Sequence, residues 1–353
     1  MKLINPLVIL RILSIILFVE VVSFLLCIPS ALYYSESILP FLLPALITSV
    51  ISSVLYFLSR NADIDKLSSR DGYFSVTLSW LIFPLLGTLP YLFSGTIPSF
   101  INAFFESTSG FTTTGSSILT NVENLPRSVL FWRSLTHWIG GIGIIVLVLL
   151  VLPSLKVAGY QLFSLESNLK EKILPRTKAI GLRIILVYLT LTIAEIIFLS
   201  FGDMSLFDSI CYSFGTISTG GFSTKSTGMM SYSPYSQYIV MTFMFLAGIS
   251  QIVYYYIIKL NLRKVKHNEE LWFYIATIVI SGALATSILL VKTDKSLEPA
   301  IREGYFQVIS IITCTGFSSA NFAGWPMAGT LLLFILMFSG GSTCSTSGRC
   351  GSR

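Results

Sequence analysis

The sequence is poor in charge. Only 11% of its 353 residues are Asp, Glu, Lys or Arg, whereas a soluble domain has about 25%. Together with a mean hydropathy of +0.78, this excludes water as the main solvent. Apolar stretches of about 20 residues, each long enough to cross a bilayer core roughly 30 Å thick, recur along the chain. We therefore expect an all-α protein that crosses a membrane several times.

Metal and redox patterns are missing as well. The two histidines lie far apart and the five cysteines show no CxxC spacing, so neither a zinc site nor a disulfide framework is indicated. An intramembrane protease is disfavoured, because Ser250 would need a histidine at its own membrane depth and the only later one, His267, lies in a basic loop. We expect no cofactor and no enzymatic activity.

The net charge of +6 is not gathered into one patch. Basic residues instead fall in particular loops between apolar stretches, which excludes nucleic acid as a partner. By the positive-inside rule these loops and the N-terminus are cytoplasmic. The clusters are Lys2 and Arg11; Arg60, Lys66 and Arg70; Lys156, Lys170, Lys172, Arg176, Lys178 and Arg183; and Lys259, Arg263, Lys264 and Lys266.

A unit of span, short helix, loop and span occurs three times. The expected spans are roughly 8–34, 38–59, 73–94, 128–152, 180–201, 235–260, 271–291 and 326–340. After three of them comes a shorter segment that ends in Thr, Ser and Gly, at 102–115, 207–220 and 303–316. The closing glycines are 105 and 96 residues apart. Self-similarity of this kind indicates a fold built from repeated units.

The repeated loop has the composition of an ion filter. Irregular backbone at membrane depth is tolerated only where it is buried in protein or lines a water-filled cavity. Rings of backbone carbonyls can replace the water of a cation, and glycine permits the backbone angles that this requires. Helix packing through small residues would explain one such loop. Three at matching places favour a shared pore, in which the filter carbonyls set the selectivity.

Four motifs in order resemble those of the Trk/Ktr/HKT superfamily of potassium transporters, and within it the TrkH-like bacterial membrane subunits. They are Phe105-Glu-Ser-Thr-Ser-Gly-Phe-Thr-Thr-Thr-Gly115, Phe131-Trp-Arg-Ser-Leu-Thr-His-Trp-Ile-Gly-Gly-Ile-Gly143, Ile217-Ser-Thr-Gly-Gly-Phe-Ser223 and Gly340-Gly-Ser-Thr-Cys-Ser-Thr-Ser-Gly348. The resemblance runs from the first span to residue 348.

The resemblance implies span–pore helix–filter loop–span repeats around a pseudo-fourfold pore, with an extra helix pair at the N-terminus. It places the filter at Thr112, Thr113, Thr114, Gly115, Ile217, Ser218, Thr219, Gly220, Thr313, Cys314, Thr315 and Gly316. It places an intramembrane gate loop at Gly340, Gly341, Ser342, Thr343, Cys344, Ser345, Thr346, Ser347 and Gly348. Many members of the superfamily have glycine where Cys344 stands, which leaves the stiffness of the gate open.

The function that the resemblance implies is potassium uptake across the bacterial cytoplasmic (inner) membrane by the pore-forming subunit of a Trk-type system. Glycine in all three filters favours potassium over sodium. Channel-like conduction and proton- or sodium-coupled symport both stay open. The expected partners are membrane lipid, a second copy in a homodimer, and a cytoplasmic TrkA-like nucleotide-binding regulatory subunit.

The expected division is a helix pair at 1–66 and pore repeats at 67–155, 156–262 and 263–353. A fourth filter is expected about 100 residues after Gly316. The sequence ends at Arg353, so we expect repeat 4 to be absent and the chain alone to conduct poorly. The alternative function is therefore a truncated, non-conducting remnant or an assembly partner of such a transporter.

Four ionisable residues lie in or beside apolar segments. Glu106 and Arg133 are expected either to form a buried pair that braces the first filter or to face water at the interface. A structural role is expected for His137, and a polar contact between helices for Glu195. The glycines of Gly140-Gly-Ile-Gly143 lie within a span with no strand before them, which favours close helix packing over a dinucleotide site.

Overall fold

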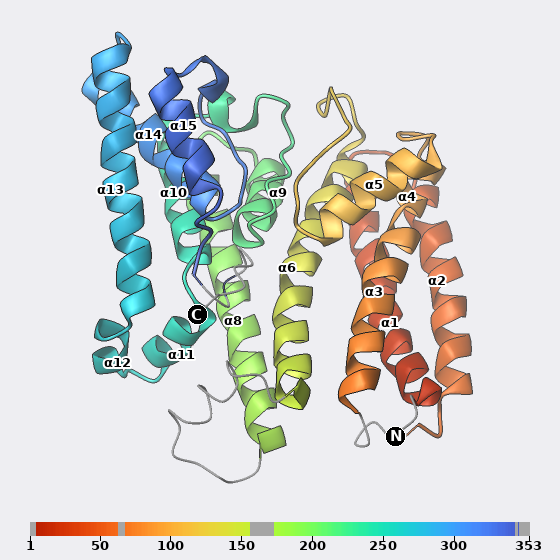
Figure 1. The fold of residues 1–353 in the computed structure, drawn as a ribbon. Helices are drawn as coiled ribbons and strands as arrows, with labels where there is room; N and C mark the ends of the chain where they lie inside the picture. Colours follow the sequence, from red (N-terminus) through yellow and green to blue (C-terminus); the bar gives the residue numbers. More distant parts are fainter. Residues whose placement is uncertain (1–4, 63–67, 156–172, 343–344, 346–353) are drawn as a thin grey trace.

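The computed structural model describes residues 5–62, 68–155, 173–342 and Ser345, and every regular element within these ranges is a helix (Figure 1). Two antiparallel helices, α1 (Pro6–Tyr33) and α2 (Leu39–Leu58), lie at one side of the molecule. Their inner faces bury Phe24 and Phe41 in a cluster with Trp132, while Phe18 and Val50 are exposed on the outside. The spans expected at 8–34 and 38–59 are confirmed.

Three units follow, and each holds a short helix between longer ones. The first unit contains α3 (Ser69–Gly87), α4 (Leu89–Phe93), α5 (Phe100–Phe111) and α6 (Arg127–Leu155). The second contains α8 (Ile173–Ser200), α9 (Leu206–Ile217), η2 (Gly228–Ser231), α10 (Pro234–Ala247) and α11 (Gln251–Ile258). After the short connecting helix α12 (Leu262–Lys266), the third contains α13 (Glu269–Lys292), α14 (Leu297–Ile312), η3 (Phe322–Gly324) and α15 (Met327–Leu336). The short helices α5, α9 and α14 lie toward the end of the molecule away from the N-terminus (Figure 1). The predicted repeat of span, short helix, loop and span is therefore present in space.

Side-chain caps fix several helix starts. Ser68 and Asp71 form a reciprocal capping box at the first turn of α3, in which each side chain accepts from the other residue's backbone N–H. The Asn268 side chain accepts from the N–H of Leu271 at the start of α13. Such caps satisfy amides that have no partner within the helix, so each helix begins at a defined residue.

Two predicted spans differ from the structure. The span expected at 235–260 is divided, because α10 ends before Gly248 and α11 begins at Gln251. A Cβ at Gly248 would lie 2.4 Å from the Tyr274 hydroxyl, so the chain passes close to α13 at the break. The span expected at 326–340 ends at Leu336, and Gly340 adopts a left-handed backbone with φ +61°.

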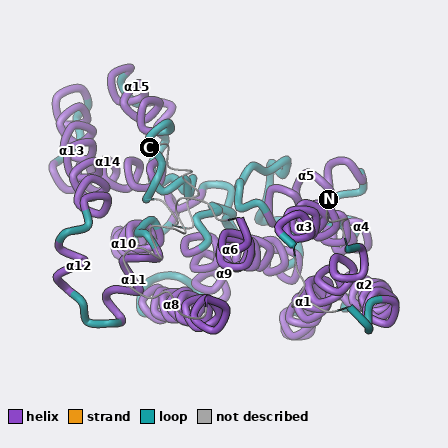
Figure 2. Tube along the Cα trace, turned by 60° about the horizontal axis from the view of Figure 1, so that its bottom comes forward, coloured by secondary structure: helices purple, strands orange, loops and turns teal. Residues whose placement is uncertain are grey.

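The outer surface is apolar. Within the described residues, five segments are long and apolar enough to cross a membrane: Pro6–Tyr33, Leu39–Leu58, Arg70–Phe93, Leu182–Ser200 and Glu269–Lys292. Large side chains such as Leu186 and Ile280 stay exposed on these helices, as expected for groups that face lipid. Figure 2, turned to look more nearly along the helices, shows α1 and α2 at one side and α13 and α15 at the other. The chain is an all-α, multi-pass membrane protein.

Candidate ion-binding site

The three short helices end in the same way. In each, the first residue after the last helical turn carries a hydroxyl that donates to the carbonyl four residues earlier. These bonds run from Thr112 Oγ1 to Thr108 at 2.7 Å, from Ser218 Oγ to Phe214 at 2.6 Å and from Thr313 Oγ1 to Ile309 at 2.8 Å. The same carbonyl also accepts the backbone N–H of that residue, so side chain and backbone together bind the last turn. The helix end is thus set by matching residues in all three units.

The backbone after each helix follows one path. The second residue of each segment has a left-handed backbone, with φ values of +54° at Thr113, +54° at Thr219 and +57° at Cys314. Glycine stands two residues later, again with positive φ: +77° at Gly115, +84° at Gly221 and +81° at Gly316. Left-handed angles at Thr and Cys are unfavourable, so the fold around each segment must hold them in place.

Amide hydrogen bonds hold these segments against their helices. The N–H groups of the second residues donate to Gly110, Thr216 and Ile311 at 3.0 Å, and those of the third donate to Ser109, Gly215 and Ser310 at 2.8–3.0 Å. Among the described backbone amides, none donates to the carbonyl oxygens of Thr113–Gly115, Thr219–Gly221 or Cys314–Gly316. These carbonyls are available to a cation, and the partly negative C-terminal ends of the helices favour one.

The second segment is one residue out of the register that its motif predicted. Ile217 is the last residue of α9 and is buried, so it belongs to the helix and not to the filter. Gly221, not Gly220, has the positive φ that matches Gly115 and Gly316. The segment therefore runs from Ser218 to Gly221. Two adjacent glycines make the register ambiguous in the sequence. The aromatic residue that follows resolves it, since Gly221-Phe222-Ser223 matches Gly316-Phe317-Ser318.

Successive segments touch through their glycines. A Cβ at Gly115 would lie 2.1 Å from the carbonyl oxygen of Gly220, and one at Gly221 would lie 1.9 Å from that of Thr315. These carbonyls occupy the same place in their segments, so the two contacts repeat one geometry. At Gly316 an added Cβ would meet no described atom within 4 Å. The three segments thus lie side by side in chain order.

A tyrosine clasp lies behind two of the segments. The Tyr188 hydroxyl of α8 donates to the Trp138 carbonyl of α6, and the Tyr274 hydroxyl of α13 donates to the Phe245 carbonyl of α10, both at 3.1 Å. In each case a glycine three residues after that carbonyl leaves room for the phenol: an added Cβ would lie 2.5 Å from the hydroxyl at Gly141 and 2.4 Å at Gly248. Gly140 and Gly141 therefore serve close packing, as predicted, whereas an added Cβ at Gly143 would meet no described atom within 4 Å.

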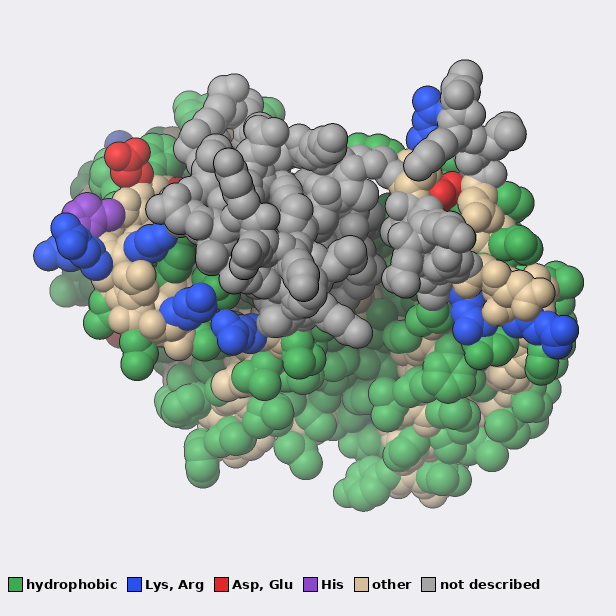
Figure 3. Space-filling view, turned by 90° about the horizontal axis from the view of Figure 1, so that it is seen from below, with side chains coloured by type: hydrophobic (Ala, Val, Ile, Leu, Met, Phe, Trp, Pro, Cys, Tyr) green, Lys and Arg blue, Asp and Glu red, His purple; other side chains and the backbone are tan. Residues whose placement is uncertain are grey.

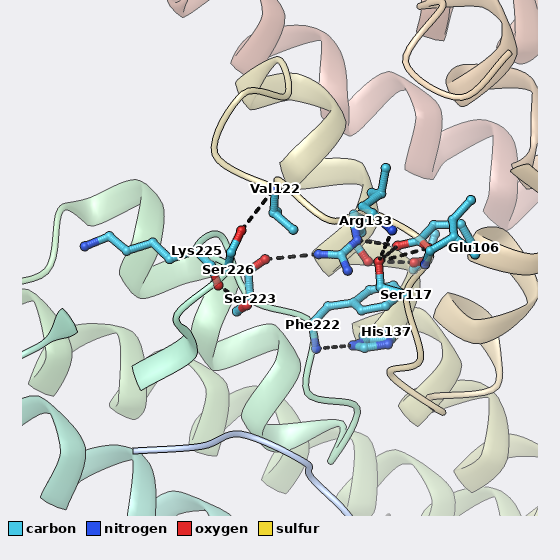
Figure 4. A network of polar contacts seen from close by, with 12 residues as sticks. Glu106, Ser117, Val122, Arg133, His137, Phe222, Ser223, Lys225 and Ser226 are labelled. Carbon is cyan, nitrogen blue, oxygen red and sulfur yellow. Dashed lines mark hydrogen bonds and ion pairs between the residues drawn. The ribbon is translucent and has the colours of Figure 1, made fainter. Parts of the chain in front are cut away.

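Glu106 and Arg133 form the predicted buried pair. Arg133 Nε lies 2.6 Å from Glu106 Oε1, and both side chains are buried (Figure 4). The same carboxylate accepts from Ser117 Oγ and from the N–H of Ile118 at 3.1 Å, just after the first filter segment. The pair therefore braces the first segment, and an interfacial position for either residue is excluded. Glu195 of α8 is also buried, and its carboxylate lies beside the Thr216 hydroxyl of α9, a polar contact between helices as expected.

The described part of the expected gate loop docks on the break in the preceding unit. The N–H of Ser342 donates to the carbonyl of Gly248 at 3.2 Å, and that of Ser345 donates to Ser342 at 3.2 Å. Gly340 and Gly341 connect this contact to the end of α15. The loop residues Thr343, Cys344, Thr346, Ser347 and Gly348 lie outside the described residues.

Charged groups at the filter end are tied to helix starts. The Asp203 carboxylate, in the turn after α8, accepts from the N–H of Ser233 at 2.8 Å and from the hydroxyls of Ser233 and Ser236. At the start of α14, the Arg302 guanidinium beside Glu298 lowers the pKa of that carboxyl. Both carboxylates therefore stay ionised at neutral pH and stabilise the turns that carry the filters.

Known proteins are similar to this chain in sequence and fold. The sequence model of the TrkH family, described as cation transport protein, matches residues 40–350. The Trk system potassium uptake protein TrkH of Salmonella typhimurium is 35% identical over 306 residues, and that of Halomonas elongata is 31% identical over 351 residues. The crystal structure of the potassium transporter TrkH from Vibrio parahaemolyticus superposes with a TM-score of 0.86 at 30% identity, and the match covers 98% of this chain and 72% of that one.

The shares of length differ between these relatives. The match covers 84% of this chain and 63% of the Salmonella protein, and 96% of this chain and 72% of the Halomonas protein. The family match includes residues 112–115, 218–221 and 313–316 and the clasps behind them. On this evidence, the chain belongs to the TrkH family of cation transport proteins.

Proposed function

We propose that this chain forms the wall of a potassium-conducting pore and serves potassium uptake. The observation that carries the proposal is the repeated filter segment, with one backbone path, carbonyls that no described amide engages, and glycine contacts that bring the segments together. Such carbonyls can take over the hydration shell of a cation. The relatives named potassium uptake protein or potassium transporter support potassium as the ion.

The filter that we propose consists of Thr112–Gly115, Ser218–Gly221 and Thr313–Gly316. The structure supports the first and third as the motifs predicted them, and the second in its shifted register. We propose that Gly340–Gly348 acts as a gate below them, since its described part is hydrogen-bonded to the broken helix at Gly248. Gly340 has a left-handed backbone at the start of the loop, a conformation that glycine adopts without steric cost.

The setting that we propose is the bacterial inner membrane, with the N-terminus in the cytoplasm. Figure 3 shows Lys and Arg side chains at the margins of the face that carries the N-terminus, where α2 ends, α3 begins and α12 lies. This agrees with the positive-inside rule. A homodimer and a TrkA-like regulatory subunit are the proposed partners, and the division at 1–66, 67–155, 156–262 and 263–353 is the proposed domain organisation.

Ion-dependent stability tests the proposed function. The purified chain is melted in detergent in KCl, in NaCl and in choline chloride, because an ion that binds only the folded state raises the melting midpoint. We expect the midpoint to be highest in KCl, and Gly221→Ala to abolish that difference. Gly143→Ala is the matched control, since its added Cβ would meet no described atom within 4 Å. Equal midpoints in all three salts for the unaltered chain would sink the proposal.

Uptake is the second readout. Vesicles that contain the chain alone are expected to accumulate 86Rb+ only slowly, with external K+ competing and external Na+ not. Coupling is tested in the same vesicles by imposing a proton or a sodium gradient, which accelerates uptake only in a symporter.

A further inference from the structure

The Phe222 ring, directly after the second filter segment, lies between two side chains of α6. The Arg133 guanidinium carbon is 3.7 Å from the centre of the ring on one side. On the other, the His137 imidazole is stacked at 3.9 Å with an interplanar angle of 16°. Arg133 and His137 are one helical turn apart and all three side chains are buried. The Phe222 ring is therefore held between the two side chains.

Hydrogen bonds hold the backbone on both sides of this ring (Figure 4). The N–H of Phe222 donates to His137 Nδ1 at 3.3 Å, and Arg133 Nη1 donates to the carbonyl of Ser223 at 3.0 Å. Since a backbone amide can only donate, Nδ1 must be the unprotonated nitrogen of a neutral ring. His137 is therefore a hydrogen-bond acceptor that faces the filter backbone.

The bond to His137 also sets the direction of a filter carbonyl. The N–H of Phe222 and the carbonyl of Gly221 belong to one peptide group, which is planar and trans, so they point in opposite directions. An N–H aimed at His137 therefore turns the Gly221 carbonyl away from α6. The His137 ring also packs against Gly220, the residue before Gly221, because a Cβ at Gly220 would lie 2.4 Å from His137 Nδ1.

The same arginine joins this arrangement to the first filter segment. Arg133 Nε is paired with Glu106, and Glu106 accepts from Ser117 and Ile118 beyond Gly115. One guanidinium thus contacts the backbone after the second segment, its aromatic ring, and the carboxylate that holds the first segment. The fork of donors on arginine makes these contacts together, which a lysine could not.

We propose that His137 and Arg133 are positioning residues that fix the orientation of the Gly221 carbonyl and thereby the ion preference of the filter, with Glu106 extending the arrangement to the first segment. This deepens the proposed function and rests on it. Neither residue touches the ion. They act on it through the Gly221–Phe222 peptide.

Two substitutions at one position separate positioning from packing. His137→Phe keeps the ring but removes the acceptor, whereas His137→Asn keeps an acceptor near the place of Nδ1 but leaves a cavity. Packing alone predicts that Asn is the more damaging change. The proposal predicts two separate effects. The melting midpoint in choline chloride falls further below that of the unaltered chain in His137→Asn, while the preference for K+ over Na+ is lost in His137→Phe.

The measurement is the concentration of K+, and separately of Na+, that gives half of the maximal thermal stabilisation of the purified full chain. We expect the K+ value to rise about fivefold in His137→Phe, as for one lost hydrogen bond, and less than about twofold in His137→Asn. Met244→Leu is the control, because Met244 is the corresponding residue of α10 and is expected to leave both values unchanged.

Three results would overturn the inference: unchanged K+ values in both His137 variants, a larger K+ effect in Asn than in Phe, or an equal shift in Met244→Leu. If His137→Phe does not fold, Arg133→Lys decides, with a K+ value about threefold higher expected and no change contradicting the proposal. If the unaltered chain does not distinguish K+ from Na+, the proposed function itself fails. That outcome is separate, because it needs no variant.

Discussion

The two interfaces between neighbouring filter units share one framework and differ in chemistry. In the first, between the first and second units, a charged and polar set surrounds Phe222; in the second, between the second and third, an apolar set surrounds Phe317. The correspondence follows from the clasp glycines Gly141 and Gly248 and from the helix ends: Glu106 corresponds to Tyr212, Arg133 to Val240 and His137 to Met244. Tyr212, Val240, Met244 and Phe317 all belong to one buried hydrophobic cluster.

This difference separates the features that both interfaces share from the features that only one of them has. The tyrosine clasp, the helix-end hydroxyl and the left-handed filter residue are present at both interfaces, so they belong to the shared geometry. The ion pair and the histidine occur only at the first. Buried charge costs desolvation energy that an apolar cluster does not, which argues that the first interface gains something other than stability.

The largest expected effect comes from breaking the ion pair. Arg133→Met leaves the Glu106 carboxylate buried without its counter-charge, and we expect about 3–5 kcal/mol of lost stability toward unfolding. Adding Glu106→Gln should recover part of this loss, because the uncompensated charge is then gone. The measurement is SDS-titrated unfolding in detergent. At the second interface Tyr212→Phe removes one hydrogen bond to Gly228, so a loss there as large as at Arg133 would contradict the comparison.

The filter glycines give the next effect, and they differ among themselves. Gly221→Ala brings a methyl group onto the Thr315 carbonyl at a positive φ, and we expect a loss of about 2–3 kcal/mol. Gly316→Ala has the same backbone strain, but its added Cβ would meet no described atom within 4 Å, so about 1–2 kcal/mol is expected. Melting both variants in choline chloride compares them without bound K+. Equal losses would show that contact between segments does not matter.

The clasps provide a sharper test of the shared framework. Tyr188→Phe and Tyr274→Phe each remove one hydrogen bond from a tyrosine to a helix carbonyl and leave the ring in place. We expect each to cost about 1 kcal/mol, and the two losses to agree. Unfolding free energies of the two variants, measured side by side, decide this. A large difference would mean that the surrounding chemistry, and not the clasp, sets the strength of each interface.

The smallest effect is expected at the rim of the first interface. Ser226 accepts from the N–H of Val122, and its own N–H donates to Glu123, which links the loops that follow the first two filters. These groups are partly exposed, so water replaces a lost partner, and Ser226→Ala should cost at most about 0.5 kcal/mol. The K+ preference should not change. A change in preference would place the coupling between segments at the rim rather than at Arg133.

The sequence was informative where one local rule decides the structure. Three similar segments, each after a span, predicted the three short helices and the ends of the first and third, because hydroxyl and glycine residues stop a helix in recognisable ways. For Glu106 and Arg133 a buried pair and an interfacial position were both expected, since buried opposite charges need partners. The structure shows the buried pair.

Contacts between distant segments were out of reach. Whether Gly220 or Gly221 occupies the filter position depends on where α9 ends, and two adjacent glycines satisfy the motif in either register. The break at Gly248 arises where α10 meets Tyr274 and Thr313, residues that follow it by 26 and 65 positions. His137 carried no signal of its role, because its partner is a backbone amide, which every residue but proline has.

The contact of Gly115 with the Gly220 carbonyl, and of Gly221 with the Thr315 carbonyl, limits how duplicated units can diverge. A side chain gained at either glycine would displace a carbonyl that belongs to the next unit, so no unit can change its filter alone. The side chains behind the segments make no such contact with the next unit's carbonyls. There the first interface has an ion pair and the second a hydrophobic cluster. The three similar units thus share a lining whose members constrain one another, while the layers that support it differ in chemistry.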